Sequence, residues 1–78
     1  MSGYEVKIKK KILAEIEKEM EAKGISQGEL GRQLDIARHH VNAYLRGRNL
    51  SLSFERIFEM ADVVGLEIDV TVKRKGRK

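Results

Sequence analysis

The capping box that begins at Ser26 is the strongest local signal in this chain and constrains its fold most. Ser26 and Glu29 have the spacing at which the serine hydroxyl accepts the Glu29 N–H and the glutamate side chain reaches back to the Ser26 N–H. Ile25 and Leu30 occupy the two positions of a hydrophobic staple. A helix is therefore predicted to start at Gln27.

A tight turn and a second short helix follow. The first helix is expected to end near Leu34, because Asp35 is a residue type that tolerates the left-handed conformation of a turn. The second is predicted from about residue 37 to 46, before Gly47. Its apolar side consists of Val41, Tyr44 and Leu45. The sequence thus predicts two short helices joined by a tight turn.

Two further helices flank this pair. One is predicted over residues 9–23 with Gly24 as its stop, and the other starts after Ser51 or Ser53 and ends at Gly65. Their apolar faces are predicted to contain Ile12, Leu13, Ile16 and Met20 in the first helix, and Phe54, Ile57, Phe58, Met60, Ala61 and Val64 in the last. These faces should form the core.

The residues before position 9 allow two interpretations. Tyr4, Val6 and Ile8 alternate with charged residues, which is the period of a strand, yet Ile8 also continues the helical stripe of the next segment. Residues 1–8 are therefore expected to be either extended or the start of the first helix.

The periodicity changes after Gly65. Apolar and polar residues alternate over positions 66–73, which is typical of a strand with one buried face. The apolar positions are Leu66, Ile68, Val70 and Val72. An unpaired strand exposes backbone hydrogen-bonding groups. Its partner is expected to be residues 4–9 or the same strand of a second copy.

Length and composition limit the class of protein. A chain of 78 residues has room for one small domain, which is only marginally stable alone. It has no cysteine, so disulfides and thiolate metal ligands are excluded. There is no apolar run of the ~20 residues that span a bilayer, and no signal peptide is evident. We expect a cytoplasmic protein without a membrane partner.

The distribution of charge indicates a polyanionic partner. The net charge is +4, and no acidic residue lies between Ile36 and Phe54. The basic residues of that stretch are Arg38, His39, His40, Arg46 and Arg48. A second basic run occupies residues 73–78. One surface should be positive, as in nucleic-acid-binding proteins, although a solvated charge run is the alternative.

Over roughly residues 12–66 the chain resembles the lambda-repressor-like helix-turn-helix family, also called the Cro/C1 or xenobiotic-response-element type. The matching residues are Ile25, Ser26, Gln27, Leu30, Gly31, Leu34, Ile36, Val41, Tyr44, Gly47, Phe54, Ile57, Ala61, Val64 and Gly65. Asp35 replaces the usual turn glycine, and Leu52 stands where many members have proline. The resemblance implies a mainly α fold, a bundle of four to five helices, with a C-terminal β-strand that pairs across a dimer.

The resemblance also implies which residues contact DNA. The expected base-reading residues are Arg38, His39, Asn42 and Ala43, the last touching a thymine methyl group. The expected contacts to the DNA backbone are Gln27, Arg46, Arg48 and Asn49. Some family members, including antitoxins, end with a strand similar to residues 66–73, and a homodimer would place two recognition helices about 34 Å apart.

Catalytic and metal-dependent functions are not expected. His39 and His40 are adjacent, so in a helix their rings diverge by about 100° and do not readily chelate one ion. The serines outside the N-terminus have credible capping roles, and no glycine-rich phosphate loop is present. We therefore expect no enzyme, no metal and no cofactor.

Three functions remain open at this point. The first is a transcriptional repressor that binds a palindromic operator as a homodimer. The second is an antitoxin that also binds a toxin protein, and the third is an interaction module without DNA binding. Residues 9–65 would be the DNA-binding domain and residues 66–73 the dimerisation strand. Residues 74–78 would be a basic tail: a DNA arm, a solubilising tail or an interaction segment. No small-molecule effector is evident.

Overall fold

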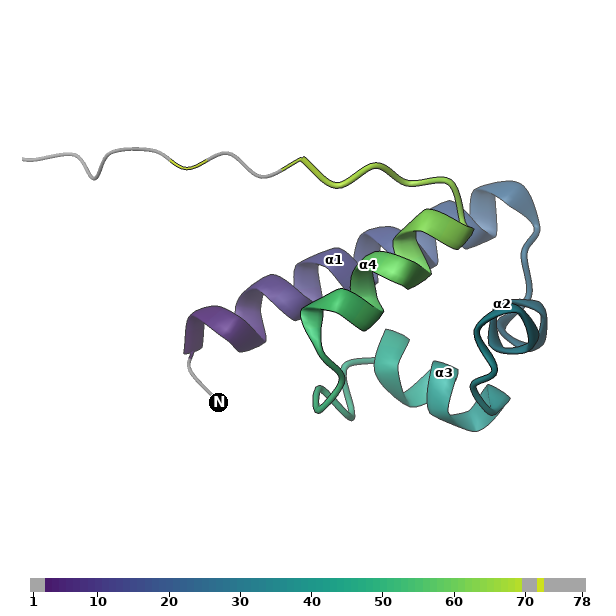
Figure 1. The fold of residues 1–78 in the computed structure, drawn as a ribbon, viewed down its shortest axis with the longest axis horizontal. Coiled ribbons are helices and arrows are strands. Elements are labelled where there is room, and N and C mark those ends of the chain that lie inside the picture. The colour runs from purple at the N-terminus through teal and green to yellow at the C-terminus, as the bar shows by residue number, and fades with distance from the viewer. Residues whose placement is uncertain (1–2, 70–71, 73–78) are drawn as a thin grey trace, which may run out of the picture.

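The computed structural model describes residues 3–69 and residue 72. In this part of the chain there are four helices: α1 (Gly3–Lys23), α2 (Gln27–Leu34), α3 (Arg38–Leu45) and α4 (Phe54–Val63). α1 packs against α3 and α4, and α2 also packs against α3 and α4. α2 and α3 lie together at one side of the longer α1–α4 pair (Figure 1). The fold is mainly helical, as predicted.

α1 begins before position 9, so the helical interpretation of the N-terminal residues is correct and residues 4–9 are not a strand. The buried residues of α1 are Lys9, Leu13, Ile16 and Met20. These positions share one face of a helix, so the buried stripe starts at a lysine. Tyr4 and Ile8 lie outside the stripe and are 78% and 46% exposed.

The predicted ends of α2 agree with the structure. The Ser26 hydroxyl accepts the backbone N–H of Glu29 at 3.0 Å. Asp35 ends the helix in the left-handed conformation, with φ 57° and ψ 44°. The chain then turns sharply, and the N–H of Ile36 donates to the Gly31 carbonyl at 2.8 Å. Capping and turn chemistry therefore set both ends of this helix.

The cap of α4 is Ser53, whose hydroxyl accepts the backbone N–H of Arg56 at 3.1 Å. The core prediction for this helix is wrong at one position: Phe58 is 43% exposed. The helix turns Ile57, Met60 and Ala61 toward its neighbours, and Phe58 falls at the edge of that face.

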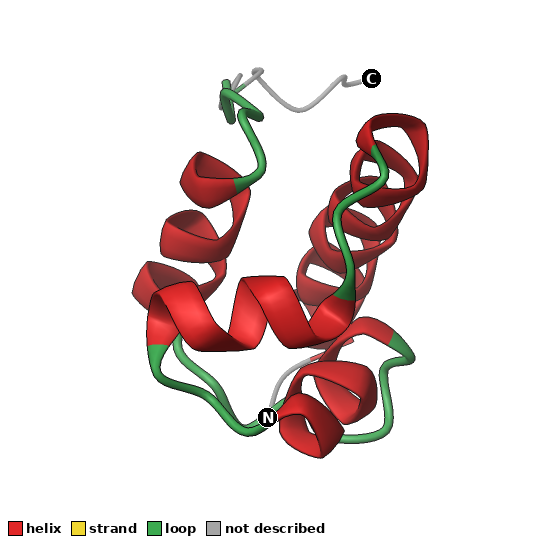
Figure 2. Cartoon of the chain, turned by 90° about the vertical axis from the view of Figure 1, so that its right-hand side faces the viewer, coloured by secondary structure: helices red, strands yellow, loops and turns green. Residues whose placement is uncertain are grey.

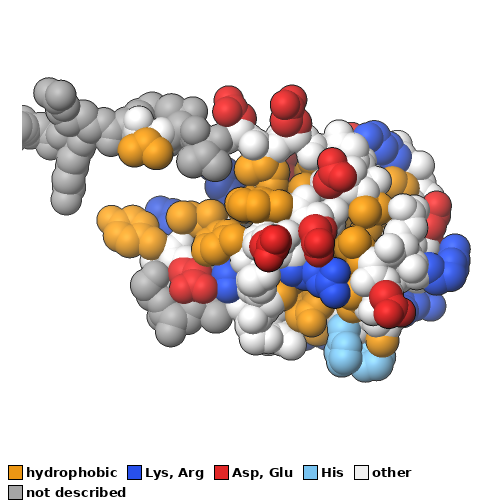
Figure 3. Space-filling view, in the orientation of Figure 1, with side chains coloured by type: hydrophobic (Ala, Val, Ile, Leu, Met, Phe, Trp, Pro, Cys, Tyr) orange, Lys and Arg blue, Asp and Glu red, His pale blue; other side chains and the backbone are white. Residues whose placement is uncertain are grey.

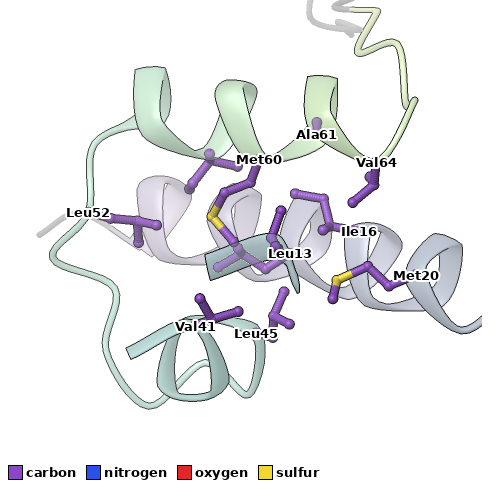
Figure 4. Close-up of a cluster of buried hydrophobic side chains, with 11 residues drawn as sticks. Leu13, Ile16, Met20, Val41, Leu45, Leu52, Met60, Ala61 and Val64 are labelled. Carbon is purple, nitrogen blue, oxygen red and sulfur yellow. The ribbon is translucent and has the colours of Figure 1, made fainter. Parts of the chain in front are cut away.

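The core lies between all four helices. Figure 4 shows that α1, α3 and α4 each contribute side chains that converge on one cluster, with Leu52 entering from the α3–α4 loop. The buried cluster comprises Leu13, Ile16, Met20, Leu30, Val41, Leu45, Leu52, Ile57, Met60, Ala61 and Val64. Because this core touches α3, it fixes how that helix is presented at the surface.

The predicted C-terminal strand is absent from the described part of the chain, where Figure 2 shows only helices and loops. After α4 the N–H of Leu66 donates to the Ala61 carbonyl at 2.8 Å. Leu66 and Ile68 are partly buried against the core. A strand also needs a partner strand, and this is a single chain. Val70 and residues 73–78 lie outside the described residues.

Among the described helices, none is long and apolar enough to cross a membrane.

Candidate nucleic-acid interface

The beginnings of α2 and α3 meet at one surface hollow. Gln27 is the first residue of α2 and Arg38 the first of α3. Together with His39 and Asn42 they line an open hollow of about 450 Å³. Three of the four predicted base-reading residues and one predicted backbone contact therefore lie together, although they come from positions up to 15 residues apart.

Gln27 and Asn42 are joined by a hydrogen bond across this hollow. The Asn42 Nδ2 donates to the Gln27 Oε1 at 3.2 Å. Gly28 lies next to Arg38: a Cβ added at Gly28 would be in ordinary van der Waals contact with the Arg38 Cδ, at 3.9 Å. The bond holds the two short helices together and fixes the rotation of the Asn42 side-chain amide.

His39 lines the hollow, and His40 follows it on the exposed side of α3. They protrude from the surface in the space-filling view (Figure 3, pale blue), and their ring centroids lie 4.2 Å apart with the planes tilted by 57°. In residues 3–69 and 72 no group of three histidine, cysteine or carboxylate side chains could hold a metal ion. The first turn of α3 contains no acidic residue.

Ala43, the fourth predicted base-reading residue, is not among the residues that line the hollow and is only partly exposed. Its carbonyl accepts two backbone N–H groups, from Arg48 at 2.9 Å and from Asn49 at 3.3 Å. The residues that follow α3 are thus tied back to that helix. This backbone connection determines where the predicted phosphate contacts of the loop are displayed.

The predicted backbone contacts after α3 have different surroundings. Arg48 is exposed. The Asn49 Oδ1 accepts the backbone N–H of Ser51 at 3.0 Å and the Ser51 hydroxyl at 2.7 Å, so it orders the loop. The Arg46 Nε lies 3.7 Å from the Glu17 Oε2, which makes Arg46 part of an ion pair with α1. Sequence reasoning missed this carboxylate.

Lys9 is a second residue that sequence reasoning missed. Lys9 lies within a charged stretch of α1, yet it is only 3% exposed. Its Nζ donates to the Leu50 carbonyl at 3.1 Å and lies 2.8 Å from the Glu5 Oε2. Lys9 precedes Leu13 by four residues on the apolar stripe, which is the signal that could have identified it. The hydrogen bond from Lys9 lowers the pKa of the Glu5 carboxyl below its ordinary value of 4.5.

Of the predicted dimerisation residues, Leu66 and Ile68 lie beside α1. Leu66 and Ile68 are partly buried, whereas Val72 is 89% exposed. A groove of about 520 Å³ runs between α1 and the chain that follows α4. It is lined by Ile8, Lys11, Ile12, Glu15, Leu66, Glu67, Ile68 and Asp69. Apolar surface therefore remains open next to this segment.

Comparison with known proteins identifies one family. The profile of a family described as a helix-turn-helix domain matches residues 3–73, which is nearly the whole chain. No curated protein and no solved structure matches the chain significantly.

Proposed function

This chain belongs to the helix-turn-helix domain family, and we propose that it is a sequence-specific regulator that represses transcription by binding a palindromic operator as a homodimer. The finer assignment, to the lambda-repressor-like type, is part of this proposal and is supported by the unbroken register of matching residues from Ile25 to Gly65. Members of helix-turn-helix families are typically DNA-binding regulators without enzymatic activity.

One observation supports DNA binding most directly: the side chains of Gln27, Arg38, His39 and Asn42 share one open hollow at the start of α3. In a helix-turn-helix the second helix enters the major groove and its N-terminal side chains contact base edges. The hollow presents a guanidinium, an imidazole and two amides, and no carboxylate lines it. This chemistry suits base edges and phosphates.

Arg38 and Asn42 are proposed to read different bases. An arginine binds O6 and N7 of guanine with two parallel hydrogen bonds, which discriminates against other bases by about 1–3 kcal/mol. Asparagine binds N6 and N7 of adenine with its oxygen and one N–H. Because Gln27 accepts the other N–H of Asn42, it would hold the amide in the orientation that adenine requires. His39 and Ala43 would contact neighbouring base pairs.

Phosphate contacts would come from both sides of the hollow. Gln27 lies in the first turn of α2, where the helix dipole favours an anion. Arg46, Arg48 and Asn49 follow α3 and would contact the DNA backbone beyond it. Such contacts orient the protein without reading sequence, and they make binding sensitive to salt.

The dimer is proposed to form through residues 66–73. Pairing this segment between two copies would bury Leu66, Ile68, Val70 and Val72 and would satisfy the backbone groups of a strand edge. The exposure of Val72 and the open groove beside α1 support an interface on this side. Two α3 helices would then lie about one turn of DNA apart.

Selection from random duplex DNA, followed by sequencing, tests this function. We expect a palindromic motif with half-sites about 10 base pairs apart, as dimeric helix-turn-helix proteins select. Enrichment of no motif, together with only weak and salt-sensitive binding, would contradict sequence-specific recognition and leave a protein-interaction module.

Substitutions of three arginines assign the roles of the site. Arg38→Ala should relax the selected sequence at one base position, and Arg46→Ala should weaken binding to all sequences and lower the salt slope by about one. Arg56→Ala is the matched control, because Arg56 pairs with Glu59 on α4 at 2.9 Å, away from α3. Equal losses on selected and random DNA for Arg38→Ala would refute its assignment as a base reader.

A further inference from the structure

Two lysines of α1 are held in the same way near opposite ends of the helix. Lys9 and Lys23 each pair with the glutamate four residues before them, at 2.8 and 3.1 Å. Each also donates to a backbone carbonyl 41 residues further along the chain: Lys9 to Leu50 at 3.1 Å, and Lys23 to Val64 at 2.8 Å. α1 is therefore tied at two points to the chain that packs against it.

The two lysines differ in burial and in what they hold. The Lys9 side chain is 4% exposed and the Lys23 side chain 44% exposed. The Lys9 Nζ also lies 5.2 Å from the centre of the Phe54 ring, a distance typical of a cation–π contact. A buried ammonium is tolerated only when charges and hydrogen bonds compensate its lost hydration. Lys9 has a carboxylate, a carbonyl and an aromatic ring for this purpose.

The carbonyl that Lys9 holds belongs to the loop between α3 and α4. This loop carries Arg48 and Asn49, whose backbone N–H groups donate to the Ala43 carbonyl of α3. One end of the loop is thus fixed to α3 and the next residue, Leu50, is fixed to α1 by Lys9. Arg48 and Asn49, two of the proposed phosphate contacts, therefore directly precede the carbonyl that Lys9 holds.

We infer that Lys9 is a positioning residue for DNA binding: it sets the place of Arg48 and Asn49 and does not contact DNA itself. Lys9 is buried and its charge is compensated by Glu5, so it is not available to a phosphate. Without its ammonium, the Leu50 carbonyl would lose its donor and the loop could shift relative to α3. This inference rests on the proposed function.

The test compares Lys9→Met with Lys23→Met in the full chain. Both variants lose one ion pair and one hydrogen bond to a carbonyl, but only Lys9 holds the loop. Binding is measured by fluorescence anisotropy on a duplex with a single half-site and on a random duplex, at about 50 to 200 mM salt. A single half-site keeps dimerisation out of the comparison.

We expect Lys9→Met to weaken binding about five-fold on both duplexes and to lower the salt slope by about one, because phosphate contacts are lost. Lys23→Met should keep the wild-type affinity and slope. Lys7→Met removes an exposed charge from the same helix and should also bind like the wild type. In NMR spectra, Lys9→Met should shift the amide signals of residues 48–51 more than that of Arg38.

Two results would overturn the inference. One is an equal loss of affinity in Lys9→Met and Lys23→Met, since a general loss of stability would explain it; the other is an unchanged salt slope in Lys9→Met. If Lys9→Met does not fold, Glu5→Gln serves instead, with an expected loss of about two-fold on both duplexes; wild-type binding by that variant would also overturn the inference. Failure of the wild type to bind any duplex would refute the proposed function itself.

Discussion

Gly31 and Asp35 shape the turn between α2 and α3. A Cβ at Gly31 would lie 2.3 Å from the Ile36 carbonyl oxygen, so only glycine lets the chain fold back so closely. Asp35 adopts φ 57°, a conformation that costs most residues about 1–2 kcal/mol but that aspartate tolerates better. These two backbone requirements determine the angle at which α3 leaves the turn, and hence how it faces a ligand.

Gly31→Ala should destabilise the protein by about 2–4 kcal/mol, because the clash is with backbone that cannot move without opening the turn. Chemical denaturation measures the free energy of unfolding. Gly28→Ala in the same helix is the control: its nearest contacts would be at 3.9 Å, and its stability should stay within about 1 kcal/mol of the wild type. Equal effects of the two substitutions would show that helix propensity, and not the close approach in the turn, causes the loss of stability.

Glu5 should make stability depend on acidity. The hydrogen bond from Lys9 lowers the pKa of Glu5 in the folded protein. The pair therefore stabilises the fold fully at pH values above 4.5, the ordinary pKa of the group. This contribution is lost as the pH falls through the lowered pKa. The melting temperature of the wild type should therefore exceed that of Glu5→Gln at neutral pH, and the difference should shrink in acid. A difference independent of pH would contradict this assignment.

Among the helices, α1 packs against the helix that carries the proposed base-reading residues. It packs against both α3 and α4, and its Glu17 approaches Arg46 just after α3. The pair is partly exposed, with side chains 28% and 57% accessible. Exposed ion pairs contribute about 0–1 kcal/mol, so a DNA phosphate could compete with Glu17 for the guanidinium. Glu17 of α1 would thus lower the positive charge that Arg46 makes available to DNA.

Glu17→Gln should increase DNA affinity about two- to five-fold on selected and random duplexes alike, because Arg46 is then free to contact phosphate. Anisotropy titrations measure the change. Glu15→Gln alters the net charge equally, and Glu15 pairs with Lys18 at 3.9 Å, so it serves as the control. The same increase in both variants would indicate an effect of net charge only.

At the scale of the whole molecule, the fold separates two faces. The start of α3 presents basic and amide side chains. Exposed apolar residues lie instead on α1, on α4 and in the segment after α4: Tyr4, Ile8, Phe58 and Val72. Exposed apolar surface of this kind is typical of association sites. Under the proposed function, the first face would bind DNA and the second would meet a second copy of the chain.

Deletion of residues 66–78 should leave a monomer that binds a full palindrome much more weakly, because the two α3 helices would no longer be joined. Analytical ultracentrifugation measures the oligomeric state, and anisotropy the affinity. Binding to a single half-site should change less than binding to the palindrome. A truncated protein that remains dimeric with unchanged affinity would refute the proposed interface.

The limits of α2 could be predicted from the sequence because they depend on local chemistry: Ser26 caps one end, and Asp35 accepts the left-handed turn at the other. The placement of Arg38 and Asn42 on one helix, four residues apart, also followed from the sequence, since the predicted helix spans both. The register of a helix follows from nearest neighbours along the chain, so sequence is sufficient there.

Helix packing was needed to reveal that Lys9 bonds to the Leu50 carbonyl, that Phe58 is exposed and that Arg46 meets Glu17. Each of these depends on which part of a helix faces a distant segment, and apolar periodicity alone does not give the width or the edges of that face. A lysine within a charged run carries no local sign of a carbonyl 41 residues away. Contacts between residues remote in sequence exist only once the helices have packed.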